Sequence, residues 1–524
     1  MQADLILRGG RIRPLGSFGP RRFPNLAVAA GRVLAVGGDE VLGLGGRATR
    51  TVDLAGASVL PGFNDPHAHV VYFGLSSFGA DLTGCRTLGE LQGRLGRTAA
   101  ALPAAAWCLG RGYSETELEE GRAPTRWELD AVTGGRPAFV DHRGGHSRVA
   151  NTAALLAAGI TADSPDPVGG SIGRGPDGQP DGRLLEAAMR LVSDHQPPPA
   201  IEQRREGILR CQRLLLSRGI TSTGAAVNRG FADDLRAFQQ LAEEGRLRVR
   251  VNEFLSWELL PALRELGLAT GSGDGLVRLG PVKVFVDGGA SRGTAAMRTG
   301  GGTWRTSPEE LKRLVGEANG ARLQVAAHCV GDGAIEAMLD AVEAAQAEGV
   351  TGLRHRVEHC SVCPPDLRAR MGRLGVIAVM QPLFATFGRE RLAAQFGADL
   401  VPDVAPHAAL LAAGVTVAFS SDLPVTPDPN PWLGIRAAVH DPLQGISMLE
   451  AVRAYTQAGA FTSFEEGDKG TLEPGRVADL QVYRSDPFEF VPTAPRPDLV
   501  LVGGSVAFRR RPGSAKIAPG PRGL

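Results

Sequence analysis

Cysteine, net charge and long apolar runs are all scarce in this chain. Only 6 of its 524 residues are cysteines, and Lys plus Arg (57) almost balance Asp plus Glu (56), which leaves a net charge of +1. No apolar run approaches the roughly 20 residues that a membrane-spanning helix needs, and the first residues lack the basic and apolar segments of a secretory signal. These absences argue against a disulfide-stapled secreted domain, a membrane protein and a basic nucleic-acid-binding surface.

The cysteines are also widely spaced. Only Cys360 and Cys363 form a Cys-x-x-Cys pair, and a zinc knuckle would need a second pair. We therefore expect reduced thiols in a cytoplasmic protein with a small-molecule substrate, no nucleic-acid partner and no membrane partner. A homodimer is a further expectation about its assembly.

The two ends of the chain share a pattern of short strand-like runs separated by glycine pairs, as at Gly9-Gly10 and Gly503-Gly504. We expect residues 1–57 and 466–508 to form one small β-sandwich domain, residues 58–465 to form a separate barrel domain, and residues 509–524, rich in Arg, Pro and Gly, to be a disordered tail.

The middle of the chain is typical of a (β/α)₈ barrel of the TIM type. Its eight expected strands are Val59–Phe63, Ala138–Asp141, Ile220–Thr223, Val282–Val286, Leu323–Ala327, Arg356–Glu358, Val376–Met380 and Val415–Ser420. The run Ser307-Pro308-Glu309-Glu310 predicts the start of a helix that ends at Gly320, and Ala334–Ala347 has helical periodicity. Segments 70–136 and 150–215 are too long for single crossovers, so we expect them to form an insertion over the barrel mouth.

Potential metal ligands stand at the ends of these runs. His67 and His69 follow the first run two residues apart, so that their side chains can point the same way on an extended chain. His328 and His359 each end a later run, and Asp422 follows another and precedes a proline-rich loop. Because a barrel gathers the carboxyl ends of its strands on one face, we expect these residues to converge there on a divalent metal.

Lys283 lies among Val and Phe residues, where a charged amine is costly to bury. Two interpretations remain open. The ammonium pairs with a carboxylate such as Asp287, or the amine is neutral and takes up CO₂ as a carbamate that bridges two metals.

In their joint order, several segments resemble the amidohydrolase superfamily, in its type-3 branch that includes N-substituted formamide deformylases. They are Pro61–His69, Arg143–His146, Gly169–Ile172, Gly219–Ser222, Val282–Met297, Gln324–Asp332, His355–His359, Met380–Pro382, Ser420–Pro424 and Gly470–Asp479. The resemblance implies a TIM-like barrel flanked by a β-sandwich, and metal-dependent hydrolysis of a C–N bond. The chain departs from the family pattern at Thr223–Ala226, where the family often has an Asp.

The resemblance also implies roles. His67, His69 and Asp422 would bind one ion, His328 and His359 a second, and a carbamylated Lys283 would bridge them; some members use one metal and no bridging lysine. The expected cofactor is one or two divalent ions, zinc first, with manganese or iron as alternatives.

Further residues are candidates in the pocket. We expect His146 to polarise the substrate carbonyl, and Arg292 and Asn151 to contact the substrate. The predicted reaction is hydrolysis of an amide or formamide by metal-activated water, with Asp422 as the proton acceptor. Lactone or ester hydrolysis and deamination use the same residues and stay open as alternatives, as does a barrel that binds without catalysis.

Overall fold

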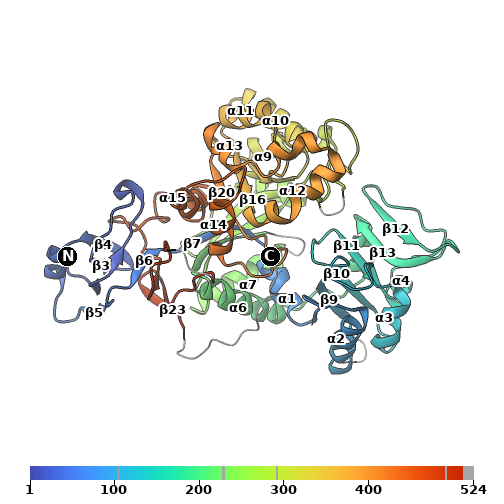
Figure 1. The fold of residues 1–524 in the computed structure, drawn as a ribbon, viewed down its shortest axis with the longest axis horizontal. Coiled ribbons are helices and arrows are strands. Elements are labelled where there is room, and N and C mark those ends of the chain that lie inside the picture. Colours follow the sequence, from blue (N-terminus) through green and yellow to red (C-terminus); the bar gives the residue numbers. More distant parts are fainter. Residues whose placement is uncertain (104–105, 227–230, 291–292, 490–492, 511–524) are drawn as a thin grey trace.

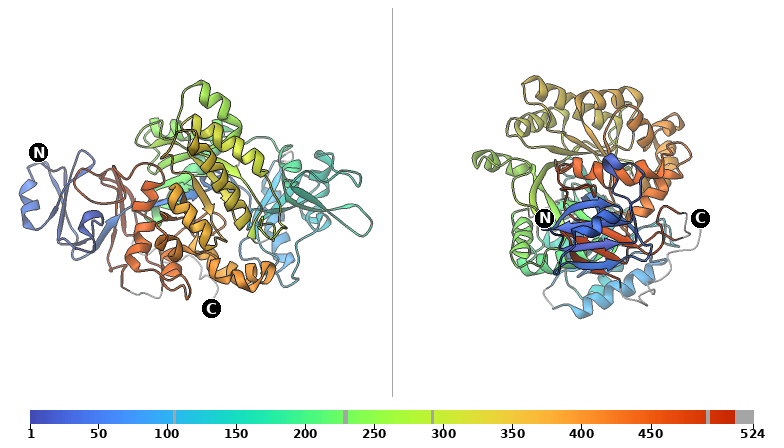
Figure 2. Two further views of the ribbon diagram at one scale, coloured as in Figure 1. Left: turned by 90° about the horizontal axis from the view of Figure 1, so that it is seen from above. Right: turned by 90° about the vertical axis from the view of Figure 1, so that its left-hand side faces the viewer.

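The computed structural model describes residues 1–524 except 104–105, 227–230, 291–292, 490–492 and 511–524. Three parts follow one another along the long axis of the molecule (Figures 1 and 2). Small sheets that include the N-terminal strands lie at one end, a barrel lies in the middle, and a mixed sheet with its own helices lies at the other end. No helix among the described residues combines the length and the apolar character that crossing a membrane requires.

The central sheet has eight strands in the order β20-β19-β18-β17-β16-β15-β14-β7, and each ladder is parallel. Its strands are β7 (Phe63–Ala68), β14 (Ile220–Ala225), β15 (Arg250–Ser256), β16 (Val277–Phe285), β17 (Val325–Cys329), β18 (Arg356–His359), β19 (Ile377–Met380) and β20 (Val417–Phe419). The first and last strands meet through backbone bonds at one end: Asp422 N–H donates to the carbonyl of His67 at 2.9 Å, and His69 N–H donates to that of Leu423 at 2.8 Å. The predicted TIM-like barrel is therefore confirmed.

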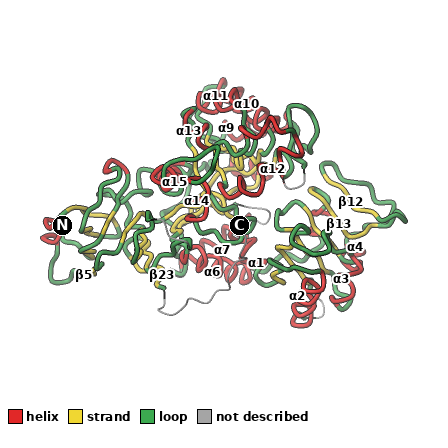
Figure 3. Tube along the Cα trace, in the orientation of Figure 1, coloured by secondary structure: helices red, strands yellow, loops and turns green. Residues whose placement is uncertain are grey.

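Helices surround the barrel strands (Figure 3). The main ones are α6 (Ile201–Ser217), α7 (Phe231–Glu243), α8 (Leu260–Glu265), α9 (Pro308–Gly320), α10 (Asp332–Ala347), α11 (Pro365–Leu374), α12 (Pro382–Phe396), α13 (His407–Ala412), α14 (Pro431–Val439), α15 (Met448–Ala454) and α16 (Gln457–Phe461). Helix α9 begins after Ser307, whose hydroxyl accepts from Glu310 N–H at 3.2 Å, so the predicted start and the end at Gly320 are both confirmed. Buried Leu, Val and Ala side chains on these helices pack on the outer face of the strands and form the largest core.

Two of the eight predicted barrel strands were wrong. Ala138–Asp141 belongs to β10 (Ala138–His142) of the inserted sheet, and the missing barrel strand is β15. The run Val59–Phe63 is divided: β6 (Ser58–Pro61) pairs with the C-terminal strand β21 (Leu480–Tyr483), and β7 begins at Phe63. The chain changes sheets at Gly62, where a Cβ would lie 2.1 Å from Thr221 Oγ1 and so could not fit.

The terminal strands form two sheets. The first, in the order β4-β3-β1-β5, contains β1 (Leu5–Arg8), β3 (Asn25–Ala29), β4 (Arg32–Gly37) and β5 (Arg50–Asp53). The second, in the order β2-β6-β21-β22-β23, adds β2 (Arg11–Ile12), β22 (Leu499–Val502) and β23 (Ser505–Arg509) and so joins both ends of the chain. The exact domain bounds stay a prediction, and most of the expected tail lies outside the described residues.

The inserted sheet has the order β12-β13-β11-β10-β9-β8 and leaves the barrel after α1 (Val70–Ser76). Its elements are β8 (Ala80–Asp81), α2 (Leu88–Ala101), β9 (Cys108–Tyr113), α3 (Arg126–Thr133), β10, β11 (Ser147–Ala150), α4 (Thr152–Ala157), β12 (Gly170–Arg174), β13 (Pro180–Glu186) and α5 (Met189–Ser193). The hydroxyl of Tyr72 on α1 donates to Asp141 on β10 at 3.0 Å, which ties the insertion to the segment that follows His69.

Candidate metal centre

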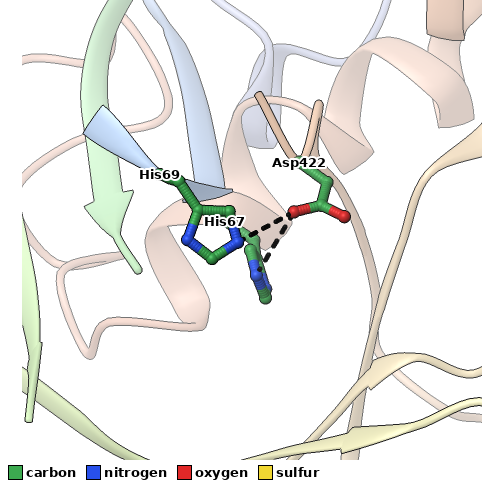
Figure 4. A group of neighbouring side chains, drawn as sticks. All are labelled: His67, His69 and Asp422. Atoms are coloured by element: carbon green, nitrogen blue, oxygen red, sulfur yellow. Dashed lines mark ion pairs between the residues drawn. The ribbon is translucent and has the colours of Figure 1, made fainter. Parts of the chain in front are cut away.

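His67, His69 and Asp422 form a compact group where the first and last barrel strands meet. Figure 4 shows both imidazoles turned toward one carboxylate oxygen. Asp422 Oδ1 lies 3.3 Å from His69 Nε2 and 3.6 Å from His67 Nε2, and one ligand atom from each residue lies within 4.8 Å of the others. These three donors suit a divalent metal such as zinc.

The local backbone explains this convergence. The two histidines stand two residues apart at the end of β7, as expected for side chains on one face of an extended chain. Asp422 follows β20 with a φ of 52°, in the left-handed region that non-glycine residues seldom adopt. Asp65, fully buried, accepts from both the N–H and the hydroxyl of Ser421 and so fastens the end of β20 to β7 beside the site.

The other three predicted ligands lie in the same place. The rings of His328 and His359 have centroids 4.5 Å apart, and the His359 ring is 5.3 Å from that of His67. Lys283 Nζ lies 3.5 Å from His67 Nε2. The structure therefore brings all six residues to one end of the barrel: His67, His69, Lys283, His328, His359 and Asp422.

Burial controls the charge of this group. It lowers the pKa of His67 to about 3 and also lowers the pKa values of His328 and His359, so these imidazoles are neutral and keep a nitrogen lone pair. Burial also lowers the pKa of Lys283, to about 8, although nearby Glu358 and Asp422 oppose this effect. Burial alone would raise the pKa of Asp422, but the adjacent imidazole of His69 and those of His67 and His359 hold it below its usual value.

The residues fit a metal by a further observation. Asp422 Oδ1 is buried and has no hydrogen-bond partner among the described residues. An unpaired buried carboxylate oxygen is costly, and buried charges are normally paired or coordinate metals. A cation held by Asp422 and the two histidines would satisfy this atom.

His146 reaches the same mouth from the insertion. Its ring centroid lies 5.6 Å from that of His328, and its Nδ1 lies 2.9 Å from Glu186 Oε2 at the end of β13. The hydroxyl of Thr294, in the segment after β16, donates to Glu186 Oε1 at 2.9 Å. The insertion and the barrel therefore hold this imidazole together.

One other predicted residue, Asn151, does not join the site. Asn151 is fully buried in the insertion: its Oδ1 caps α4 through Ala154 N–H, and its Nδ2 donates to Thr133 and Arg136. Its amide has no capacity left for a substrate, so the predicted substrate contact is dropped. Arg292 lies outside the described residues.

Asp287 does not pair with Lys283 as one interpretation supposed. Its carboxylate accepts the backbone N–H groups of Ala296, Val330 and Gly331, which joins the loops after β16 and β17. Burial raises its pKa to about 7 although these bonds oppose the effect. Its role is to hold the loops beside His328.

Glu358 was not among the residues predicted from the sequence; it is fully buried and contacts His67 Nδ1. The sequence did contain a signal for this residue. Glu358 stands directly before a predicted ligand, inside a short strand-like run where a charged side chain needs a partner. Gln381 was also missed as a contact; its Oε1 lies 2.9 Å from His359 Nδ1.

Comparisons with known proteins agree with this geometry. Residues 50–508 match the model of the Amidohydrolase family. Protein LONG AFTER FAR-RED 3 of Arabidopsis thaliana is 30% identical over 517 residues, with 93% of this chain and 88% of that protein covered. N-substituted formamide deformylase of Arthrobacter pascens is 28% identical over 496 residues, with 88% and 90% covered.

Among solved structures, an uncharacterized metal-dependent hydrolase from Pyrococcus horikoshii OT3 superposes with a TM-score of 0.77 at 28% identity. The match covers 93% of this chain and 98% of that one. The family model, the relatives and the barrel with its His-His-Asp group lead to one conclusion: this chain belongs to the amidohydrolase family.

Proposed function

We propose that this protein is a metal-dependent hydrolase that cleaves a non-peptide C–N bond, in an amide or formamide of a small molecule. The observation that carries the proposal is the buried convergence of His67, His69 and the unpaired Oδ1 of Asp422 at the barrel mouth. Family membership and the likeness to a metal-dependent hydrolase support hydrolysis, and the likeness to a formamide deformylase supports the C–N bond.

The proposed metal set divides into two groups. His67, His69 and Asp422 would hold one divalent ion, and His328 and His359 would hold a second. Lys283 would join them as a carbamate; its lowered pKa of about 8 supports this role because only the neutral amine reacts with CO₂. Zinc suits these nitrogen and oxygen donors, and manganese and iron are the alternatives.

A bound divalent metal would supply a water nucleophile at neutral pH, because it lowers the pKa of water to about 7. The Asp422 carboxylate would take the proton of that water and deliver it to the leaving nitrogen. When it carries a proton on both ring nitrogens, His146 would donate from Nδ1 to Glu186 and from Nε2 to the carbonyl oxygen of the substrate.

Two of the proposed ligands pack against aromatic rings. The Phe384 ring on α12 stacks on His359 with centroids 6.3 Å apart, and the Phe285 ring packs 5.6 Å from that of His328. These rings favour a substrate with an apolar substituent beside the scissile bond.

The six cysteines are all free and buried, which supports a reducing, cytoplasmic location.

A substrate panel tests the proposal. Zinc-loaded protein would be offered N-substituted formamides, N-acyl amines, N-acyl amino acids, lactones and aminopurine nucleosides, with formate, amine, acid or ammonia as measured products. We expect turnover of formamides or N-acyl amines, and none by a His67→Gln/His69→Gln variant. Turnover of lactones or nucleosides alone would show that the protein cleaves a different class of bond from the one proposed. If protein with bound zinc turned over no compound of the panel, this would favour a barrel that binds a ligand without catalysis.

A further inference from the structure

Resting on the proposed function, we infer that Arg356 and Glu358 form a positioning pair that sets His67 to bind a divalent cation through Nε2. Both residues lie on β18, two positions apart. Their side chains point into the barrel beneath the ligands, where Arg356 lies over the Phe254 ring at 4.9 Å. Arg356 is 2% exposed and Glu358 is 0% exposed, so water does not screen this pair.

Both carboxylate oxygens of Glu358 accept hydrogen bonds. Arg356 donates from Nε to Oε1 at 2.7 Å and from Nη2 to Oε2 at 3.0 Å, and Oε2 also contacts His67 Nδ1. Arg356 Nη2 also donates to the carbonyl of Pro66 at 3.0 Å, directly before His67 in the chain. The pair therefore holds both the backbone and the imidazole of this ligand.

These contacts decide the tautomer of His67. A carboxylate that accepts two hydrogen bonds from one guanidinium is ionised and has no proton to give. His67 Nδ1 must therefore be the donor. In a neutral imidazole the lone pair is then on Nε2, the atom that lies 3.6 Å from Asp422 Oδ1 and 3.5 Å from Lys283 Nζ.

Two other histidines among the proposed ligands, His69 and His359, face neutral acceptors. His69 Nδ1 lies 3.1 Å from the carbonyl of Ala226, and His359 Nδ1 lies 2.9 Å from the amide oxygen of Gln381. A carboxylate partner makes an imidazole a stronger base than a carbonyl does, and loss of such a partner costs about 10–100-fold in metal affinity. Among these three histidines, His67 therefore depends most on its supporting partner.

The test measures Zn²⁺ affinity by competition with a chromophoric chelator. Glu358→Gln removes the charge but leaves Arg356 buried without its counter-ion, which endangers folding. The decisive protein is therefore the double variant Arg356→Met/Glu358→Gln, which buries no unpaired charge. The matched control is Glu466→Gln, which breaks a different pair, with Arg354 at 2.7 Å, outside the metal group.

We expect the double variant to bind Zn²⁺ about 10–100-fold more weakly than the wild type, and the control to bind it equally well. A folded double variant with wild-type affinity would overturn the inference while leaving the proposed function intact. A wild-type protein that binds no Zn²⁺ would overturn the proposed function and the inference with it.

A second measurement needs no folded variant of the pair. In wild-type, metal-free protein with ¹⁵N-labelled histidine, the tautomer of each imidazole is read from its nitrogen chemical shifts. A His67→Gln protein identifies the His67 signals by their loss. The inference expects a proton on Nδ1 of His67, and a proton on Nε2 instead would contradict it.

Discussion

Replacing Asp422 by Asn separates the chemistry of this carboxylate from its shape. The side chain keeps its size, so the backbone bond from residue 422 N–H to the His67 carbonyl at 2.9 Å should persist and the protein should fold. The amide cannot accept the proton of the attacking water, and it faces His69 and His67 without a negative charge. General acid–base catalysis contributes about 10²–10⁴-fold, which equals about 2.7–5.4 kcal/mol at about 1.36 kcal/mol per tenfold.

The assay is steady-state turnover of a substrate found in the panel, at zinc concentrations that saturate each protein. Saturation matters because the same change removes a metal ligand and weakens binding. We expect kcat to fall by about 10²–10⁴-fold while thermal unfolding stays close to that of the wild type. Asp53→Asn, which changes an exposed pair with Arg8, serves as the control with unchanged kcat. Turnover of Asp422→Asn within about threefold of the wild type, with zinc bound, would refute the proposed role.

Four further results are expected. Removal of metal with a chelator should abolish turnover, and zinc, manganese or iron should restore it; full activity in metal-free protein would contradict the proposal. Lys283→Ala should lower the metal content from two ions toward one per chain and reduce kcat by at least about tenfold, whereas two ions retained would remove the bridging role. His146→Gln should lower kcat by about 10²–10³-fold with little effect on folding, and an effect on KM alone would limit it to substrate binding. Glu465→Gln should destabilise the fold by about 3 kcal/mol because it leaves Lys469, 2.7 Å from the carboxylate, buried without its counter-ion.

The Glu465 pair also predicts a pH dependence. Burial opposes ionisation of this carboxyl, but Lys469 and hydrogen bonds from Asn252 and Ser463 lower its pKa from 4.5 to about 2. Because the folded-state pKa is the lower one, the stabilisation is fully present above about pH 4.5 and is lost as the pH falls toward 2. The difference in thermal midpoint between wild type and Glu465→Gln should therefore narrow between these pH values, and a constant difference would contradict this assignment.

The convergence of the ligands could be predicted from the sequence because a parallel barrel gathers the ends of its strands. His328 and His359 end neighbouring strands, and the register places Cys329 opposite His359. The position of Asp422 was harder to predict, because only the closure of β20 against β7 brings this residue to His67. Helix α9 was predictable from its local capping residues, which act within one turn.

The errors arise where local patterns do not specify which sheet a strand joins. Phe139 and Val140 are as buried as residues of a barrel strand, although β10 lies in the insertion. In β15, Asn252 hydrogen-bonds Glu465 and Phe254 packs against His67, so polar and apolar residues share the inner face and hide the usual alternation. Glu358 was missed for a related reason. Arg356 lies two residues away on the same strand, but His67 becomes a neighbour of Glu358 only when the barrel forms.

The most direct test of the account is an anomalous-scattering measurement at the zinc edge on crystals grown with Zn²⁺. The account predicts a peak about 2.0–2.2 Å from the ligand nitrogens of His67 and His69 and from an oxygen of Asp422. A fully occupied zinc elsewhere in the molecule, or no peak between these three side chains, would contradict it.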